Sequence, residues 1–414
     1  MSQATAPPRG GLARYVVAAA LARSADAGGV VAVVLIVSSG GGPAWVGGLL
    51  GACITAPHLL GPFVARPLDT AADGRKVIAL AALVHGAALA AAVLAYPHTP
   101  IAVPALLLIA SGLVGPFLTG GISSRLPAIA GTTRRGQRRA QGWDVATYGL
   151  SGTLGPTIVA LISAWSSPTV AALVLAAATF AAAGLVFLLP FAPPAVQDTQ
   201  VPRPLRTLRI MLVSGRLRRT LYLTIVVAWA VAVLPITAVH STTGLGAAAA
   251  AAGALTAAYG AGNLVGSAGV MLRPPRGEAD RLMSLLALAV AVALAFALAA
   301  PNLWAAVLCY AAVGVANAYF FAATLAARTE YSPPQARGQI FVWIGALKIT
   351  AGSAGTALAG AIIGVWVHLP LVLATAFTLL AALVSQLDRL AHRPAASAEK
   401  RGTPADPDHG RHRP

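Results

Sequence analysis

The sequence predicts an all-α membrane protein with twelve transmembrane helices, and three observations lead to this fold class. First, 57% of the 414 residues are hydrophobic and only 10% are charged, whereas soluble domains carry about 25% charged residues. Second, apolar runs long enough to cross about 30 Å of hydrocarbon as helices recur along the chain. Third, positive charge alternates between the loops. Helices are expected because a lipid-exposed segment must satisfy its own backbone hydrogen bonds.

The predicted spans are separated by clusters of Gly, Pro and polar residues, of which Tyr96-Pro97-His98 and Ala300-Pro301-Asn302 are examples. Each span is long enough to cross the bilayer once. In chain order they cover residues 12–37, 44–66, 77–96, 101–124, 143–164, 168–190, 220–241, 247–271, 282–300, 302–327, 339–366 and 368–388.

The net charge of +17 would be typical of a nucleic-acid-binding protein if it formed one face of a soluble domain. Instead, the loops after the even-numbered internal spans hold nearly all internal Lys and Arg, and the loops after odd-numbered spans hold none. The positive-inside rule therefore places both termini and the basic loops in the cytoplasm. This pattern predicts contact with membrane lipids and no nucleic-acid partner.

The longest internal connection divides the chain into six spans plus six. Its three leucines Leu205, Leu208 and Leu212 lie at helical spacing among arginines. They indicate either an amphipathic helix on anionic headgroups or a solvated basic linker. The predicted organisation is a cytoplasmic N-terminus (1–11), an N-terminal six-helix bundle (12–191), a basic cytoplasmic loop (192–219), a C-terminal six-helix bundle (220–390) and a disordered cytoplasmic tail (391–414).

The two halves repeat weakly in sequence. Arg139-Ala-Gln141 before the fifth span matches Arg337-Gly-Gln339 before the eleventh, and His58-Leu-Leu-Gly61 is similar to Asn263-Leu-Val-Gly266 in the eighth. The agreement in order and position indicates duplicated, pseudo-symmetric halves, an internal symmetry that transporters show.

Twelve spans, duplicated halves, a basic central loop and cytoplasmic termini resemble the major facilitator superfamily over residues 12 to about 390. The loop between the second and third helices of that family reads Gly-x-x-x-Asp-Arg-x-Gly-Arg-Arg. Asp69 and Gly74-Arg75-Lys76 match it, whereas Ala65 replaces the first Gly, Thr70 replaces the Arg, and two residues are inserted.

Gly152-Thr-Leu-Gly155-Pro156 in the fifth span is similar to the Gly-Pro segment of antiporters in the family. The Arg that drug–proton antiporters commonly carry midway along the fourth helix is missing from this sequence. The resemblance implies a fold in which helices 1, 4, 7 and 10 surround a central cavity and helices 2, 5, 8 and 11 form the seam between the halves. It also implies a monomer that is a transporter and not an enzyme.

Asp26 in the first span is the candidate coupling residue. A charge at the centre of a membrane helix costs about 2.5–3.5 kcal/mol. Two interpretations, which are not exclusive, explain its presence. Asp26 is either a proton- or cation-binding site on a cavity helix, or the partner of Arg23, which lies three residues earlier on the same helical face.

Other polar residues inside the spans are candidates for the substrate or proton pathway. Lys348 would contact an anionic substrate, pair with a charge across the seam, or bond a carbonyl or water. His58 at similar depth can titrate near neutral pH, or serve as a neutral hydrogen-bonded residue. Asn263, Asn317 and Tyr319 would either line the cavity or bond neighbouring helices.

Asp144 at the start of the fifth span is predicted to join Asp69 and Arg75 in a cytoplasmic charge cluster. Such a cluster would latch the halves together in the outward-open state. The alternative is a set of exposed charges at headgroup level, whose pairs are worth under about 1 kcal/mol.

No soluble chemistry is indicated, because the acidic residues are too few and scattered for a metal cage or a paired-carboxylate site, and no cofactor is expected. The Gly-x-x-x-x-Gly-Lys-Ser/Thr loop that ATP-driven proteins use is not found in the sequence. The sequence therefore predicts a secondary transporter of a small apolar or amphipathic molecule in the plasma (cell inner) membrane, with proton-coupled export preferred. The alternatives are a uniporter or uptake permease without proton coupling, and a membrane-embedded enzyme or sensor.

Overall fold

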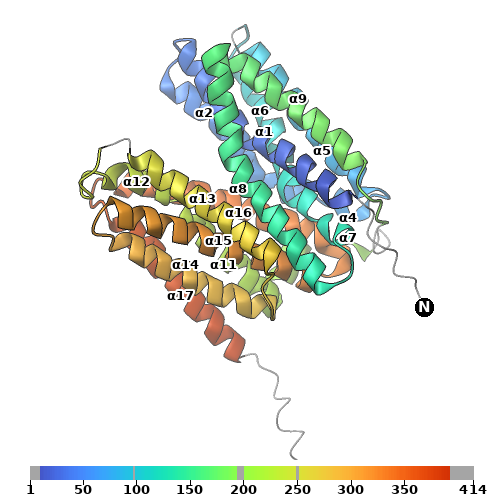
Figure 1. The fold of residues 1–414 in the computed structure, drawn as a ribbon. Helices are drawn as coiled ribbons and strands as arrows, with labels where there is room; N and C mark the ends of the chain where they lie inside the picture. The colour runs from blue at the N-terminus through green and yellow to red at the C-terminus, as the bar shows by residue number, and fades with distance from the viewer. Residues whose placement is uncertain (1–9, 97, 194–199, 249–250, 392–414) are drawn as a thin grey trace, which may run out of the picture.

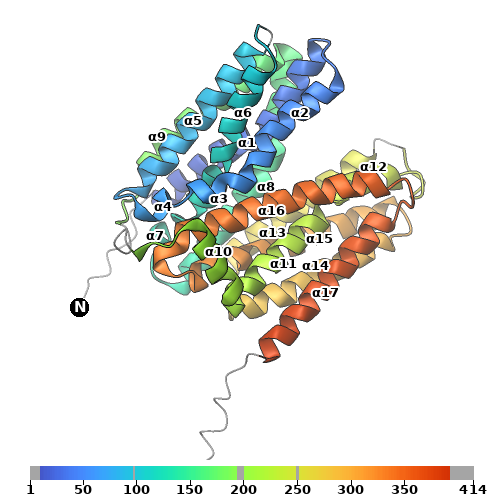
Figure 2. The ribbon, with the colours of Figure 1, turned by 180° about the vertical axis from the view of Figure 1, so that it is seen from behind.

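A computed structural model describes residues 10–96, 98–193, 200–248 and 251–391, and its helices form two bundles joined at one end (Figures 1 and 2). The predicted C-terminal tail and most of the predicted N-terminal segment lie outside these ranges. The elements are α1 (Gly11–Ser39), α2 (Ala44–Thr55), η1 (Ala56–Leu60), α3 (Gly61–Val64), α4 (Pro67–Thr70), α5 (Gly74–Ala95), α6 (Ala102–Pro116), η2 (Phe117–Gly121), α7 (Leu126–Ile129), α8 (Arg134–Trp165), α9 (Pro168–Phe187), α10 (Pro204–Val213), α11 (Gly215–Val231), α12 (Leu234–Ser241), α13 (Ala251–Leu272), α14 (Ala279–Leu298), α15 (Leu303–Tyr331), η4 (Pro334–Ala336), α16 (Arg337–Ile362) and α17 (Leu369–Ala391).

All twelve predicted spans coincide with a helix or with consecutive helices, so the predicted fold class is confirmed. Eleven segments of the described chain are long and apolar enough to cross a membrane. The remaining span, α13, has 22 residues, but its glycines, Asn263 and Ser267 lower its hydropathy.

Helix α8 contains the whole predicted fifth span, 143–164, and begins nine residues before it, at Arg134. The Thr133 hydroxyl accepts the N–H of Gly136 at 3.2 Å and caps the N-terminus of the helix. A hydropathy pattern cannot report this cytoplasmic extension, because the added turns are rich in arginine.

Three spans are broken near prolines. In the second span, Pro57 lies in the 3₁₀ segment η1 between α2 and α3. In the fourth, the π-helical segment η2 follows Pro116 directly. In the seventh, α11 ends at Val231 and α12 starts at Leu234, next to Pro235. Proline has no N–H and disrupts the helical ladder, and the freed backbone groups are tolerated in a membrane where protein surrounds them.

The Gly-Pro segment of the fifth span packs α8 against α1. A Cβ at Gly155 would lie 2.4 Å from the carbonyl oxygen of Ser24 and 2.9 Å from the nitrogen of Gly28. Nearby, the Ser151 hydroxyl donates to the Ala20 carbonyl at 3.1 Å. This close approach holds the two helices together within one bundle.

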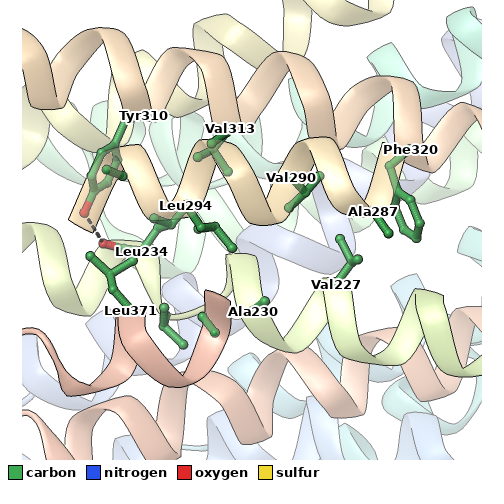
Figure 3. Close-up of a cluster of buried hydrophobic side chains, with 14 of the residues drawn as sticks. Val227, Ala230, Leu234, Ala287, Val290, Leu294, Tyr310, Val313, Phe320 and Leu371 are labelled. Atoms are coloured by element: carbon green, nitrogen blue, oxygen red, sulfur yellow. Dashed lines mark hydrogen bonds between the residues drawn. The ribbon is translucent and has the colours of Figure 1, made fainter. Parts of the chain in front are cut away.

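The C-terminal bundle has its own apolar core. Figure 3 shows Val227, Leu294 and Val313 converging from α11, α14 and α15, with Leu371 of α17 beside them. The one polar side chain labelled there, Tyr310, donates its hydroxyl to the Leu234 carbonyl at 3.4 Å. This core holds α11, α14, α15 and α17 of the C-terminal bundle together.

The bundles meet at the end that carries the basic loops. Every residue is buried in three stretches at this end, 115–124, 320–328 and 338–346. A helix that is buried all round must be surrounded by other helices. Further along α16, only Ala351, Gly355 and Ala359 are buried. Figures 1 and 2 show the bundles diverging from this contact toward α2 and α12. The protein is therefore closed at its cytoplasmic end.

The central connection contains the predicted helix, α10, but this helix packs on protein. Met211 is fully buried among residues of α11 and α16. The Thr207 hydroxyl donates to Oε1 of Gln339 at 3.2 Å, and Nε2 of Gln339 donates to the Pro202 carbonyl at 3.0 Å. The solvated-linker interpretation is wrong for this helix, while Leu205 and Leu212 remain exposed and available to lipid.

The α1–α8 contact gives a direct stability prediction. We expect Gly155→Leu to destabilise the detergent-purified protein by about 1–3 kcal/mol, because overpacking forces the helix backbones apart. Gly152→Leu is the matched control, since in the described chain no atom outside the local helix backbone lies within 4 Å of a Cβ at that position. Thermal unfolding measures both variants. Equal unfolding temperatures for the two would contradict the packing described above.

Candidate functional site

Arg23 is the centre of a buried polar site between α1 and α8. Its side chain is 3% exposed, and Nη1 lies 2.8 Å from Oδ1 of Asp144. Nη2 donates to the Ser123 hydroxyl at 2.9 Å and to the Thr119 carbonyl at 3.2 Å. Thr147 is a further partner of Nη1. The Thr119 carbonyl belongs to η2, where the π-helical turn leaves carbonyl groups available to side chains.

Asp144 completes this site and is fully buried. Besides Arg23, its carboxylate accepts the Tyr15 hydroxyl at 2.5 Å and the Ser123 hydroxyl at 2.8 Å. The prediction that Asp144 joins Asp69 and Arg75 in a cytoplasmic cluster is therefore wrong. The reason is the early start of α8, which places Asp144 about 15 Å along the helix from Arg134.

Asp26 pairs with His58 and not with Arg23, so the predicted local ion pair is not found. Nε2 of His58 lies 3.4 Å from Oδ1 of Asp26, and the two side chains are 2% and 15% exposed. Nδ1 of His58 lies 2.9 Å from the Ile54 carbonyl, to which it can only donate. Nε2 is thus the free imidazole nitrogen that faces the carboxylate.

A second histidine lies near this pair and was not a candidate from the sequence. His85 on α5 is 1% exposed, and its Nδ1 lies 3.0 Å from the Ser111 hydroxyl of α6. It is close enough to act electrostatically on Asp26. Three titratable groups contributed by η1, α5 and α1 therefore lie near one another inside the N-terminal bundle: His58, His85 and Asp26.

Lys348 lies at the seam between the bundles, over two aromatic rings. Its Nζ is 3.5 Å from the ring centre of Phe321 and 4.9 Å from that of Tyr148. The guanidinium of Arg23 covers the Tyr148 ring at 3.6 Å. The two rings meet edge to face at 4.9 Å. Arg23 of the N-terminal bundle and Lys348 of the C-terminal bundle therefore both contact the Tyr148 ring.

Arg328 is the residue of this cluster that sequence reasoning missed, because it comes directly after an apolar run and was assigned to a cytoplasmic loop. It is 1% exposed on the last turn of α15. Its guanidinium lies 5.9 Å from the Phe321 ring and 5.7 Å from the Phe341 ring. Within the described chain, its Nε and Nη2 have no hydrogen-bond partner. No local sequence signal distinguishes it from the exposed arginines of the other basic loops.

The polar residues of the eighth and tenth spans bond one another. Nδ2 of Asn317 donates to Oδ1 of Asn263 at 3.0 Å and to the Tyr259 hydroxyl at 3.1 Å. Tyr319 packs against Gly269, where a Cβ would lie 2.3 Å from its hydroxyl oxygen. These contacts match the interpretation in which polar residues join α13 to α15.

No family model and no curated protein sequence matches this chain. Solved structures do match it. The human organic anion transporter MFSD10 has a TM-score of 0.71 at 14% identity, with 92% of this chain and 100% of that chain covered. A bacterial homologue of the iron transporter ferroportin, in an outward-facing state, has a TM-score of 0.70 at 12% identity, with 92% and 98% covered. The proton:xylose symporter XylE of the major facilitator superfamily has a TM-score of 0.63 at 12% identity, with 91% and 95% covered.

The chain has the major facilitator superfamily fold. The helix pairs expected at the seam of this fold are found, since α8 packs on α13 and α16 packs on η1, α3 and α4. Every helix of the N-terminal bundle is drawn in blue to green and every membrane helix of the C-terminal bundle in yellow-green to red, so the seam is visible in Figures 1 and 2.

The superfamily-like loop contributes one contact across this seam. The Asp69 carboxylate accepts the N–H of Gly338 at 2.7 Å and the N–H of Gln339 at 2.8 Å. It thereby caps the N-terminus of α16, where free amides and the helix dipole favour an anion. Burial raises the pKa of Asp69, while the two amides and Arg125 oppose this effect.

Charged residues of the basic loops add a second contact on the other side of the seam. Nη2 of Arg138 on α8 lies 2.7 Å from Oε1 of Glu330 and 3.2 Å from the Gly277 carbonyl. Glu330 also lies 3.2 Å from Arg134. With the Asp69 contact, the two halves are connected on both sides of the cytoplasmic seam.

The rest of the loop motif acts within the N-terminal bundle. Arg75 pairs with Asp73 at 2.9 Å and donates to the Leu189 carbonyl at 2.6 Å. The hydrogen bonds from Arg75 lower the pKa of Asp73. Gly74 leaves room for the side chain of Arg125, because a Cβ at position 74 would lie 2.7 Å from its Nη1. Lys76, the last residue of the motif, is exposed. Arg75 therefore braces the loop and does not contact Asp144.

Closure of the cytoplasmic end can be tested through Asp69. In Asp69→Asn the amide group faces two N–H donors with one acceptor oxygen, so one donor is left unpaired at a cost of about 1–3 kcal/mol. Opening then becomes more frequent by about tenfold for every 1.4 kcal/mol. The reporter is Val342→Cys in a background without Cys53 and Cys309, because Val342 is fully buried against the N-terminal bundle.

We expect a membrane-impermeant maleimide to label this cysteine faster from the cytoplasmic face in Asp69→Asn. Asp73→Asn is the matched control, because Asn is also a good N-cap and the partner of Asp73 in the described chain is Arg75 of the same bundle. Similar labelling rates in all three backgrounds would show that Asp69 does not hold the seam closed.

Proposed function

We propose that this chain is a secondary active transporter that moves a small amphipathic molecule across the plasma (cell inner) membrane by alternating access. The proposal includes coupling to protons, export as the direction and a monomer as the working unit. The observation that carries it is the Asp26–His58 pair, a buried site that can hold one proton inside the N-terminal bundle.

The chemistry of this pair supports proton binding. Because Nδ1 of His58 donates to the Ile54 carbonyl, a neutral imidazole would present the lone pair of Nε2 to Oδ1 of Asp26. That arrangement is repulsive if the carboxylate is ionised. A single proton on either atom converts the repulsion into a hydrogen bond or an ion pair. The pair is therefore suited to take up and release one proton.

The position of the pair supports coupling. Asp26 and Arg23 lie three residues apart on α1, yet Asp26 faces η1 and Arg23 reaches Tyr148 at the seam. A change in the charge of Asp26 therefore acts on its contact with His58 and, through α1, on the contact of Arg23 with Tyr148. It can bias the arrangement of the bundles only if the pair binds the proton differently in the two arrangements.

One-sided closure supports alternating access. The bundles pack at the cytoplasmic end through the amides of Gly338 and Gln339 and through Arg138 with Glu330. Apolar packing of Val145 on α8 with Phe321 and Phe341 of the other bundle adds to these contacts, and the larger part of each apolar core lies within one bundle. Rocking of one bundle against the other can therefore exchange closure at one end for closure at the other.

The similar structures include a human organic anion transporter, a homologue of an iron transporter and a proton:xylose symporter. Their substrates differ, so the fold does not identify the substrate here. Export is proposed from the resemblance of Gly152-Thr-Leu-Gly155-Pro156 to the antiporter segment. An amphipathic substrate is proposed because the cavity helices are mostly Ala, Val and Leu.

The test begins with a compound panel applied to cells that express the protein, with and without a protonophore. The transported compound is then followed in proteoliposomes with an imposed pH gradient. We expect Asp26→Asn to lose accumulation against a substrate gradient but to retain exchange, because the neutral side chain cannot release a proton. His58→Gln should behave similarly.

Glu278→Gln is the control, because this carboxylate lies in a loop outside the membrane and its side chain is 61% exposed. It should accumulate substrate as the unmodified protein does. Accumulation by Asp26→Asn at the unmodified level would exclude coupling through Asp26. If the unmodified protein only equilibrates the substrate, at the same rate with and without the protonophore, a uniporter is favoured. If it accumulates the substrate and the protonophore has no effect, an uptake permease without proton coupling is favoured.

A further inference from the structure

Three cations converge at the centre of the seam, and only one of them is neutralised. Arg23 is paired with Asp144 at 2.8 Å. Several charged groups of the described chain interact electrostatically with Lys348 and Arg328, and Asp144 is the only carboxylate among them. The carboxylate of Asp144 is already occupied by Arg23, Tyr15 and Ser123. The cluster therefore has a formal excess of positive charge.

This excess is unfavourable for the protein alone. Arg328 is 1% exposed, and its Nε and Nη2 have no hydrogen-bond partner in the described chain. Buried arginines are normally paired or hydrogen-bonded, because removing a charge from water is costly. The aromatic rings near Arg328, at 5.7 and 5.9 Å, compensate a cation only weakly at such distances.

The cations come from both bundles. Arg23 is on α1 of the N-terminal bundle, whereas Arg328 and Lys348 are on α15 and α16 of the C-terminal bundle. Positive charges on opposite sides of a seam repel each other, and an anion between them would replace that repulsion with attraction. Such an anion would contact both halves, as expected of a substrate in alternating access.

The apolar surroundings complete the chemistry of the site. The rings of Tyr148, Phe321 and Phe341 lie beside the three cations. Aromatic rings offer flat apolar surface to the body of a ligand. The Arg328 guanidinium can bond a carboxylate or sulfonate through Nε and Nη2 at once, because neither has a hydrogen-bond partner in the described chain.

We propose that Arg328, Lys348 and Arg23 form the binding site for the anionic group of an amphipathic organic substrate, with the aromatic rings holding its apolar body. The substrate role rests on the proposed transport function. Anion binding itself does not depend on transport and can be measured separately.

The probes are 2-naphthoate and 2-naphthalenesulfonate, with neutral methyl 2-naphthoate and cationic 2-naphthylmethylammonium as matched compounds. Binding is measured by thermal unfolding of the full-length protein in detergent. We expect the two anions to raise the unfolding temperature in a saturable manner and the neutral and cationic compounds to leave it unchanged.

The variants are Arg328→Met and Lys348→Met, and the control is Arg139→Met, which removes an exposed arginine of α8. We expect anion affinity to fall at least tenfold in the first two variants and to be unchanged in the control. Without ligand, Arg328→Met should unfold at the same temperature as the unmodified protein or higher, because an uncompensated charge is removed. A structural arginine would instead lower that temperature on removal.

The outcomes separate this proposal from the proposed function. The anion site would be overturned if neither anion raised the unfolding temperature of the protein. It would also be overturned if the anions stabilised Arg328→Met as much as the unmodified protein. Binding of the anions without flux in proteoliposomes would leave the site standing and contradict transport of such anions. Transport of a neutral or cationic panel compound by a protein that binds no anion would support transport and exclude the anion site.

Discussion

The buried ion pair between Arg23 and Asp144 is the interaction on which the rest of the site depends. It joins α1 to α8 and ties both to the η2 turn through Thr119. Removing one partner would leave an uncompensated charge in the membrane interior, at a cost of about 3–5 kcal/mol. By holding Arg23 toward the seam, the pair leaves Asp26 to face His58 on the other side of α1. One helix therefore serves two sites.

These two sites divide the work expected of a coupled transporter. The Asp26–His58 pair lies inside one bundle, where it can exchange a proton without contacting the opposite half. The cluster of Arg23, Lys348 and Arg328 lies between the bundles, where a ligand contacts both. Because Arg23 and Asp26 share α1, the proposed proton binding and the proposed ligand binding would be linked through one helix. Linkage of this kind is reciprocal, so each ligand would alter the affinity for the other.

The cytoplasmic contacts explain why closure can be both specific and reversible. Asp69 binds backbone amides at the start of α16, and Arg138 binds Glu330 at the end of α15. Both contacts form between helix ends, so they break when the bundles separate, together with the apolar packing of Val145 against Phe321 and Phe341. Charge–amide contacts of this type have strict geometry, which favours one closed arrangement over many loosely packed ones.

The sequence by itself determined the number of spans and their orientation, because bilayer thickness sets helix length and loop charge sets direction. The two-bundle fold was predicted from the repeated halves, the long central connection and the resemblance to the superfamily. It also identified Asp26, Arg23, Lys348 and His58 as polar residues inside the membrane. Their pairing was decided only by the tertiary structure. Pro57 turns His58 toward Asp26 in a 3₁₀ segment, the cytoplasmic extension of α8 carries Asp144 to Arg23, and the last turn of α15 buries Arg328. Such pairs join residues distant in the chain, and helix periodicity gives the face of each residue but not the neighbouring helix it meets.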